Sequence, residues 1–378
     1  MGVDARIGAA NNIASGSGTV RSDDQLPSHR AIDNGNPAIF RPKWLVLDDI
    51  NIDLITVATI VAALASTIFL QTRPALSIGA AAAVLLPLRT FFPRPKIPEG
   101  LVLITGASSG IGAEFSYIFA EKGHDLILVG RNEEKLAAVK ENVESKYGRK
   151  AYTIAADLSL AGVAQQLYDH IKGKGFKVEV LVNGAGLGGA GNTLDQPIEL
   201  TERMTVLNCI TLVQLTQLFG RDMIERGRGW MLQITSIGGW LASPYQNLYH
   251  ATKHYARAFS EALSVELRAH PGIVNTQLMP GPTHTQFITR AHAEELTMMA
   301  TPLTLEDPRQ VAMAGYRGLC KGKRMVFSSW NGAMSALTLQ LVPRSVHLTM
   351  GALMNTPLRG LKRVQEPEKD QKARGEDL

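Results

Sequence analysis

The spacing of apolar and polar positions divides this chain into distinct parts. From residue 101 onward, short apolar runs alternate with longer amphipathic ones. The short runs predict strands over residues 101–105, 126–129, 151–156, 178–182, 230–234, 273–279 and 324–327. The intervals between them predict helices that begin near Ile111, Glu133, Ala161, Glu199 and Leu248. This alternation indicates an α/β fold with a single Rossmann-like, doubly wound parallel sheet, whose ligand lies outside the carboxyl ends of the strands.

The residues before this region follow a different pattern. Residues 1–45 are rich in Gly, Ser, Asn and Asp and hold few large apolar groups, so we expect a disordered tail. Residues 54–88 form an apolar run broken by the single charge of Arg73. The first half, 54–70, is just long enough to cross a bilayer as a helix, and the second half is either another span or an interfacial segment. A buried helix pair within the domain is the alternative.

Basic residues follow the apolar run at Arg89, Arg94 and Lys96. Such a cluster favours the cytosolic side of a membrane for the domain that follows. We therefore expect four parts: a tail over 1–45, a membrane-anchoring helical segment over 46–96, a catalytic domain over 97–330 and a carboxyl-terminal part over 331–378. This arrangement predicts a membrane-anchored protein, at the endoplasmic reticulum, with its catalytic domain facing the cytosol.

Composition narrows the classes of function. The chain has 378 residues and a formal net charge of +5, but its basic residues are scattered through the predicted domain, and no nucleic-acid-binding motif is present. We therefore expect no nucleic-acid partner. The two cysteines, Cys209 and Cys320, exclude a disulfide framework and a Cys-based zinc site, and no metal site is expected.

The first predicted strand leads directly into a glycine-rich turn, Thr105-Gly-Ala-Ser-Ser-Gly-Ile-Gly112, and then into a helix. Such a turn lets the backbone approach a pyrophosphate, which the amino end of the helix favours electrostatically. The residues expected to bind the cofactor here are Thr105, Gly106, Ser108, Ser109, Gly110, Ile111 and Gly112. A second glycine-rich stretch, 184–189, follows the fourth strand and predicts a tight loop flanking the cofactor.

The end of the second strand distinguishes between the two nicotinamide cofactors. An acidic residue there would bind the 2′-hydroxyl of the ribose, but the residues are Gly130 and Arg131. Gly130 leaves room, and Arg131 supplies a cation for a 2′-phosphate, which predicts NADP(H). Stacking of Arg131 on the adenine is the alternative.

The stretch from Ser236 to Lys253 holds the candidate chemistry. On a helix, Tyr249 and Lys253 lie one turn apart on the same face, and Ser236 follows a strand that ends beside them. An ammonium beside a phenol favours the phenolate, so we expect the pKa of Tyr249 to lie below its usual value of about 10. Tyr168 and Lys172 repeat the spacing, but position 155 holds Ala where a serine is required, so this pair is expected to be structural.

Taken together, residues 98–330 resemble the short-chain dehydrogenase/reductase family. The matching residues are Thr105-Gly-x3-Gly-Ile-Gly112, Asp157-Leu158, Asn183-Gly-Ala-Gly186, Asn208, Ser236, Tyr249-x3-Lys253 and Pro280-Gly281. The family usually has asparagine where this chain has Gly184. With the apolar run, the chain also resembles microsomal steroid and 3-oxoacyl reductases, and residues 221–287 are similar to general ketoreductases.

The resemblance implies a role for each matching residue. Tyr249 is the general acid in carbonyl reduction, Ser236 binds the carbonyl oxygen, Lys253 lowers the pKa of Tyr249 and holds the nicotinamide ribose, and Asn208 positions a water. For the cofactor, Asp157 accepts from the adenine amino group, Leu158, Asn183 and Gly184 lie alongside, Pro280 and Gly281 flank the nicotinamide, and Thr285 lies near its carboxamide. The family also implies a homo-oligomer.

Substrate choice rests on the variable segments. Residues 282–302, including Met298 and Met299, lie where a lid is expected, and Trp240 and Tyr245 are predicted to line the pocket. Residues 334–359 predict an amphipathic helix, either at a membrane surface or over the pocket. The sequence therefore predicts a membrane-anchored NADPH-dependent reductase of a ketone on a lipophilic substrate, such as a secondary metabolite, a fatty-acyl chain or a steroid. The alternatives are a lipid alcohol dehydrogenase that works oxidatively and a non-catalytic membrane scaffold.

Overall fold

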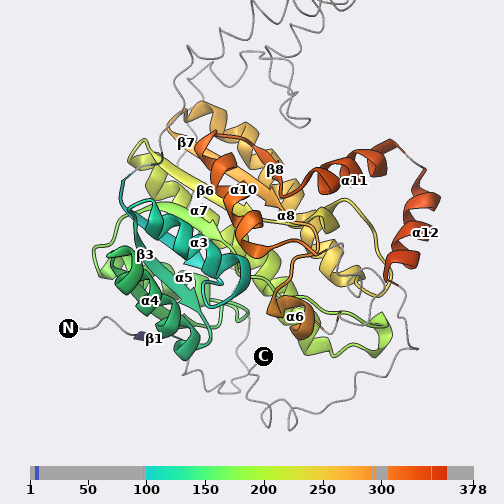
Figure 1. Ribbon diagram of the computed structural model, residues 1–378, viewed down its shortest axis with the longest axis horizontal. Coiled ribbons are helices and arrows are strands. Elements are labelled where there is room, and N and C mark those ends of the chain that lie inside the picture. The colour runs from blue at the N-terminus through green and yellow to red at the C-terminus, as the bar shows by residue number, and fades with distance from the viewer. Residues whose placement is uncertain are drawn as a thin grey trace, which may run out of the picture.

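The computed structural model describes residues 5–7, 97, 99–291, 293, 305–341 and 343–355, and over these the chain forms one α/β unit (Figure 1). Its centre is a sheet of parallel strands in the order β1-β4-β3-β2-β5-β6-β7-β8. The strands are β1 (Ala5–Ile7), β2 (Leu101–Thr105), β3 (Asp125–Gly130), β4 (Ala151–Ala156), β5 (Val178–Asn183), β6 (Gly229–Ile234), β7 (Ile273–Met279) and β8 (Met325–Phe327). The strands from β2 to β8 agree with the prediction to within a residue or two at each end.

The helices connect these strands on both sides of the sheet. They are α3 (Gly110–Glu121), α4 (Glu133–Tyr147), α5 (Val163–Gly173), α6 (Ile198–Thr205), α7 (Leu212–Glu225), α8 (Asn247–Glu266), α9 (Gln286–Arg290), α10 (Pro308–Cys320), α11 (Trp330–Leu341) and α12 (Arg344–Asn355). A π-helical turn, Val206–Thr211, joins α6 to α7, and short 3₁₀ turns lie at Thr193–Asp195, Ile237–Gly239 and Leu267–Ala269.

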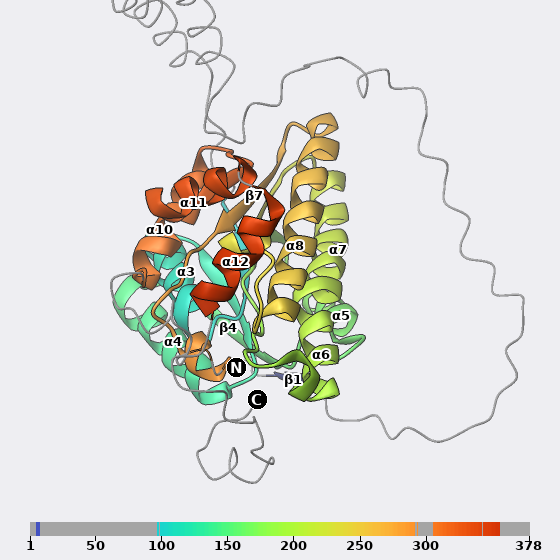
Figure 2. The ribbon, with the colours of Figure 1, turned by 90° about the vertical axis from the view of Figure 1, so that its right-hand side faces the viewer.

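Helices cover both faces of the sheet (Figure 2), and two apolar layers hold them against it. On one face, Phe115 and Phe119 of α3 pack with α4 and α10 against alternate strand residues such as Ile104. On the other face, Phe219 of α7 packs with α5 and α8 around residues such as Leu103. Side chains of adjacent strand residues point to opposite faces, so a strand buried on both sides is apolar throughout. Full burial of each such large side chain contributes roughly 2–3 kcal/mol.

Local sequence sets where helices begin and end, as α4 illustrates. Asn132 accepts a hydrogen bond from the backbone of Lys135 at the amino end of α4, and Gly148 takes the left-handed conformation just beyond its carboxyl end. Glu133 and Glu134 in the first turn and Lys146 in the last turn match the helix dipole. These are the short-range signals that a sequence carries reliably.

The segments predicted before the domain fall largely beyond the described residues. Within 1–45 only Ala5–Ile7 is described, and it pairs in parallel with β4 as an edge strand. The apolar run at 54–88 lies outside the described residues. In the part of the chain that the structure does describe, no helix is long and apolar enough to cross a bilayer.

Candidate active site

The carboxyl ends of the strands open onto a cavity of about 650 Å³. It extends from the glycine-rich turn after β2 to Tyr249 and Lys253 on α8, and residues of α11 and Met350 of α12 also line it. It lies where the strand order reverses between β2 and β5, as the doubly wound fold predicts.

The turn after β2 brings backbone close to backbone, and only glycine permits this approach. Gly106 has a φ of 72°, and a Cβ there would lie 2.8 Å from the carbonyl oxygen of Gly184. A Cβ on Gly112 would collide with the carbonyl of Gly106. The cradle therefore leaves space for a phosphate beside the first backbone N–H groups of α3, which have no partner within the helix. The cavity is lined by Gly106, Ser108, Ser109, Gly110, Ile111 and Gly112. Their contact with a cofactor stays a prediction.

Thr105 supports this turn from below. It is buried and does not line the cavity, and its binding of the cofactor stays a prediction. Its Oγ1 accepts hydrogen bonds from the backbone N–H groups of Gly184 and Ala185 at 3.0 and 3.1 Å. The hydroxyl thus joins the turn after β2 to the loop after β5.

The end of β3 has the features predicted for a phosphate on the ribose. Gly130 and Arg131 both line the cavity. A Cβ on Gly130 would lie 3.2 Å from Ser108 Oγ, so glycine keeps this corner open. A guanidinium and a serine hydroxyl at one corner are a donor set that suits a phosphate.

The ends of β4 and β5 agree only in part with the prediction. Asp157 and Leu158 line the cavity, and the Asp157 carboxylate accepts from Arg203 Nη2 at 2.8 Å and from the Ser159 hydroxyl at 2.6 Å. Its contact with an adenine stays a prediction. Asn183 does not line the cavity. This buried side chain donates to Thr216 Oγ1 and Gln233 Oε1, so it joins β5 to α7 and β6. Its contact with the cofactor stays a prediction.

Gly184 and its neighbours form the flanking loop that the second glycine-rich stretch predicted. Gly184, Ala185, Gly186, Leu187 and Gly188 line the cavity. A Cβ on Gly184 would lie 2.7 Å from the carbonyl oxygen of Thr105, so the glycine at this position permits the close approach of the two loops.

Ser236 and Tyr249 meet at the wall of the cavity. Ser236 follows β6 in extended conformation, and its Oγ accepts from the backbone N–H of Gly238 at 3.0 Å. The Tyr249 hydroxyl, on the first turn of α8, is hydrogen-bonded to Ser236. The two hydroxyls therefore present one small polar spot in a cavity whose wall is mainly apolar.

Lys253 lies one helical turn beyond Tyr249 and also faces the cavity. Its Nζ lies 5.7 Å from the centroid of the Tyr249 ring and donates to the carbonyl of Ile234 at 3.1 Å. Burial lowers the pKa of Lys253 to about 8, so the amine still carries most of its charge at pH 7.

The pKa of Tyr249 differs from the sequence prediction. Burial raises it to about 12, and the hydrogen bond with Ser236 offsets only part of that rise. The sequence predicted a pKa of Tyr249 below 10, and this is wrong for the protein without its ligands. The Lys253 ammonium bonds to the carbonyl of Ile234 and not to the phenol oxygen. At neutral pH Tyr249 is protonated, which is the form a general acid requires.

Asn208 lies on the π-helical turn between α6 and α7 and is buried. Its Oδ1 accepts from Leu187 N at 2.9 Å, and its Nδ2 donates to Leu187 O at 2.8 Å and to Thr252 Oγ1 at 3.0 Å. Asn208 therefore holds the 184–188 loop against α8. Its role in positioning a water stays a prediction.

The segment after β7 completes the cofactor side. Pro280, Gly281 and Thr285 line the cavity, and their place beside the nicotinamide stays a prediction. Thr285 caps α9 and lies against Gly110, where a Cβ would be 3.0 Å from its Cγ2. The turns after β2 and β7 therefore meet across the cavity.

Comparison with known proteins identifies the family that has this arrangement. A family model described as short chain dehydrogenase matches residues 100–296. The chain belongs to the short-chain dehydrogenase family. It is therefore an NAD(P)-dependent oxidoreductase that acts on CH–OH or C=O groups.

Individual relatives give the degree of similarity. A very-long-chain 3-oxoacyl-CoA reductase of Phaeosphaeria nodorum is 36% identical over 181 residues, which cover 46% of this chain and 52% of the relative. A 17-beta-hydroxysteroid dehydrogenase type 3 of Rattus norvegicus is 30% identical over 250 residues, covering 65% of this chain and 76% of the relative. The solved structure of a short-chain dehydrogenase from Sphingobium yanoikuyae in complex with NADPH superposes with a TM-score of 0.59 at 25% identity, covering 71% of this chain and 99% of that one.

In this family member, the wall of the cavity is mainly apolar. Apolar residues from the 184–188 loop, the segment after β6, the segment after β7 and the two last helices line it: Leu187, Leu241, Phe287, Ile288, Met334 and Met350. The Phe287 ring lies 5.4 Å from the Tyr249 ring, centroid to centroid. Of the two locations that the sequence left open for residues 334–359, the structure places the described part, on α11 and α12, over the pocket.

His250 is a pocket residue that the sequence reasoning missed. It follows Tyr249, is buried, and its Nδ1 lies 2.6 Å from the carbonyl of Leu241, so Nδ1 carries the proton. Burial lowers its pKa to about 4, which keeps the ring neutral. Its position beside Tyr249 in the sequence was the available signal.

Two predicted pocket residues do not line the cavity. The Trp240 indole donates to Met279 Sδ, and the Arg257 guanidinium stacks 3.8 Å above its ring. Tyr245, at a φ of 64°, packs against the small cluster of Ala190, Ala291 and Ala293. Neither is a cavity residue. Met298 and Met299 of the predicted lid lie outside the described residues.

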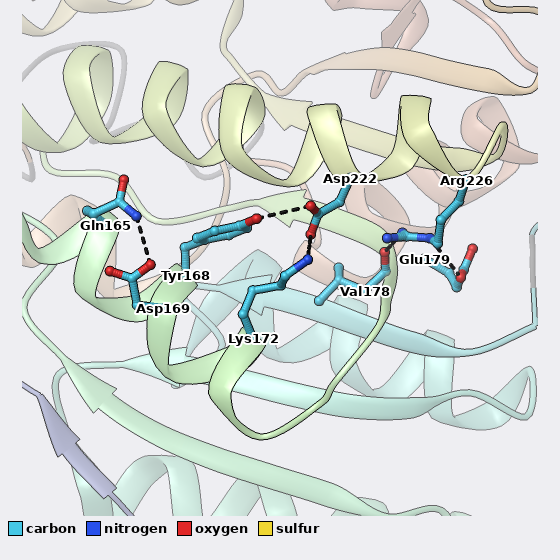
Figure 3. A network of polar contacts seen from close by, with 8 residues as sticks. All are labelled: Gln165, Tyr168, Asp169, Lys172, Val178, Glu179, Asp222 and Arg226. Carbon is cyan, nitrogen blue, oxygen red and sulfur yellow. Dashed lines mark hydrogen bonds and ion pairs between the residues drawn. The ribbon is translucent and has the colours of Figure 1, made fainter. Parts of the chain in front are cut away.

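The second Tyr-x3-Lys pair is structural, as predicted (Figure 3). Tyr168 donates to Asp222 Oδ1 at 3.0 Å, and Lys172 contacts Asp222 Oδ2 at 2.8 Å. These contacts join α5 to α7, away from the cavity. The pair therefore offers a matched control for Tyr249 and Lys253.

Proposed function

We propose that this protein is an NADPH-dependent reductase that transfers hydride to a ketone of a lipophilic substrate. The observation that carries the proposal is the hydrogen-bonded pair of Ser236 and Tyr249, with Lys253 one turn away, at the junction of a glycine-lined cradle and an apolar pocket. Family membership places the chemistry at a carbonyl or alcohol carbon.

The residues present fit a dinucleotide cofactor. At Gly106 and Gly112 the backbone of another segment lies so close that any side chain would displace it, which forms the glycine-lined cradle. The corner at Gly130 and Arg131 suits a phosphate on the ribose. When bound, NADPH supplies the hydride. Lys253 would hold the nicotinamide ribose by donating hydrogen bonds from its buried ammonium.

The chain's own groups then manage the substrate oxygen and the proton. Ser236 donates to the carbonyl oxygen and stabilises the negative charge that develops on it. Tyr249, protonated at neutral pH, donates a proton from Oη to that oxygen. The hydrogen bond from Ser236 favours the phenolate that remains, and the apolar wall of Leu187, Leu241 and Phe287 excludes water.

Oxidation of a lipid alcohol, the reverse reaction, is the second candidate function. The similarity to a hydroxysteroid dehydrogenase favours a lipid alcohol as substrate, with Tyr249 as the base. A pKa of about 12 opposes this at neutral pH, because a base must start deprotonated. Rates in both directions with NADPH, NADH and the oxidised cofactors distinguish the two.

The test of the proposal is Tyr249→Phe, with Tyr168→Phe as the matched control. Because general acid catalysis contributes about 10²–10⁴-fold, Tyr249→Phe should lower NADPH oxidation against a panel of ketones by at least about 100-fold. Tyr168→Phe should leave the rate unchanged, since the Tyr168 hydroxyl only joins α5 to α7. Equal turnover in wild type and Tyr249→Phe would reject the mechanism and favour a protein that keeps the fold only as a scaffold.

Membrane attachment is part of the same proposal. Its support is the apolar run at 54–88 with Arg89, Arg94 and Lys96 after it. The 3-oxoacyl chain named in one relative, and the mainly apolar wall of the pocket, both suit a substrate drawn from lipid metabolism.

A further inference from the structure

The loops that lead from helix to strand are strongly basic. Six such loops precede β3, β4, β5, β6, β7 and β8, and none contains Asp or Glu. Their basic residues are Lys122, Arg149, Lys150, Lys174, Lys177, Arg226, Arg228, Arg268, Lys321, Lys323 and Arg324. Along the sequence these residues are scattered over some two hundred positions, and no run of charge marks them.

The parallel sheet brings these loops together. Because every strand runs in the same direction, all loops that enter strands lie along one edge, the amino edge. A groove at this edge is lined by Lys122, Arg149, Arg317 and Lys321, from three connections and the end of α10. Ile97, where the described catalytic part begins, lines the same groove.

Nearby acids offset only part of this charge. Glu179 is buried between Arg226 and Arg228, at 3.4 and 3.2 Å (Figure 3 shows Arg226 turned onto it). Asp125 pairs with Arg149 at 2.8 Å, and Glu121 with Lys122 at 3.0 Å. Glu99 and three last-turn acids, Glu144, Glu225 and Glu266, are exposed at this edge as well. Basic residues remain in excess, and Lys150, Lys174, Lys177, Arg268 and Lys321 are exposed.

The opposite edge does not share this character. The six strand-to-helix loops that follow β2 to β7 contain only three charged residues, Arg131, Asp157 and Asp195. The cavity opens at this edge. The carboxyl ends of the helices lie at the amino edge, and helix dipoles favour cations there. The competing explanation is therefore that the basic residues only stabilise the helices.

The position of the apolar run distinguishes the two explanations. Eight residues, 89–96, separate Leu88 from Ile97. Nine Cα-to-Cα steps join Leu88 to Ile97 and span at most about 32 Å when fully extended, so the end of the apolar run must lie within that distance of the basic edge. Three of the eight, Arg89, Arg94 and Lys96, are themselves basic.

We propose that the amino edge of the sheet lies against the acidic headgroups of a phospholipid bilayer. Lysines and arginines near an anionic membrane surface bind it electrostatically, and the effect falls off within a Debye length. In this orientation the cavity faces away from the bilayer, and α11 and α12 cover it from the aqueous side. The inference rests on the proposed membrane attachment but not on the proposed reaction.

The test measures the orientation of the full chain on vesicles. Cys209 and Cys320 are changed to serine, and a fluorophore is attached at Gly173→Cys on the basic edge, where an added Cβ meets no atom within 4 Å. Two other labelled proteins report the alternatives: Leu194→Cys, 92% exposed at the opposite edge, and Leu353→Cys, 67% exposed on α12. The vesicles are phosphatidylcholine with or without phosphatidylserine, and a nitroxide on a lipid headgroup acts as quencher.

The expected result is selective quenching. The label at 173 should be quenched at least roughly twofold more than those at 194 and 353 when phosphatidylserine is present, and high salt should reduce the difference. Lys174→Glu with Lys177→Glu should reduce it too, with ketone reduction unchanged. Tyr249→Phe should abolish turnover and leave the quenching as it was, so failure of the reaction and failure of the orientation can be told apart.

Three outcomes would overturn the proposal. Quenching strongest at 353 would place α12 against the bilayer. Quenching at 173 that is the same with and without phosphatidylserine would show that the basic residues only stabilise the carboxyl ends of helices. Added RNA could also release the basic edge from phosphatidylserine vesicles, at an ionic strength at which the edge stays bound without RNA. That result would favour a nucleic acid as the partner of this edge.

Discussion

The buried ammonium of Lys253 should destabilise the folded protein, although the reaction requires it. Burial lowers its pKa from 10.5 to about 8. At roughly 1.4 kcal/mol per pKa unit, the charged amine therefore costs the folded state about 3 kcal/mol. Lys253→Met removes that cost but leaves the carbonyl of Ile234 without its 3.1 Å donor, worth about 1 kcal/mol. We therefore expect Lys253→Met to be about 2 kcal/mol more stable than wild type at pH 7 and to lose activity.

The pH dependence follows from the direction of the shift. Between pH 8 and 10.5 the unfolded chain keeps the proton on Lys253 and the folded chain releases it, so the unfolded state binds more protons. Stability of the wild type therefore rises with pH across this window. Below pH 8 both states are protonated and the cost is constant. Lys253→Met should lack this rise, and its advantage should disappear by about pH 10.5.

Urea unfolding at a series of pH values, with NADPH-dependent ketone reduction measured on the same samples, checks both statements. Lys172→Met is the control, since a hydrogen bond to Asp222 raises the pKa of Lys172 and its side chain is 47% exposed. That substitution should lower stability by at most about 1 kcal/mol and keep activity. If Lys253→Met is less stable than wild type at pH 7, burial of the ammonium is not the dominant effect and the reasoning fails.

Other predictions concern the cofactor and the substrate. Arg131→Ala should weaken NADPH binding about 10–100-fold, the value of a charge-assisted contact, with little effect on NADH; equal losses in fluorescence titrations would contradict a phosphate contact. Thr105→Val leaves Ala185 N without its acceptor, while Gly184 N keeps the Val182 carbonyl, so unfolding should become about 1–2 kcal/mol easier and NADPH binding should weaken. Thr105→Ser should restore both, and a fully stable Thr105→Val would reject the link between the loops. Phe287→Ala should raise KM for bulky ketones roughly tenfold without changing NADPH affinity; an unchanged KM would place the substrate elsewhere.

The roles of buried polar residues were the least predictable part of the site. Thr105 and Asn183 stand at the ends of strands that face the cofactor, and position in the chain alone places them in contact with it. The structure instead directs their side chains into hydrogen bonds between loops and strands. Because neighbouring strand residues point to opposite sides, a shift of one position separates a lining residue from a supporting one.

The sequence by itself determined the parallel α/β fold, the glycine cradle, the Gly130–Arg131 corner and the Ser236, Tyr249 and Lys253 set. Each of these depends on short-range signals: apolar periodicity, glycine spacing and helical repeat. Only the tertiary structure decided the pKa values of Tyr249 and Lys253, the place of α11 over the pocket and the gathering of scattered lysines on one edge. Those properties depend on burial and on contacts between residues far apart in the chain, which local patterns do not encode.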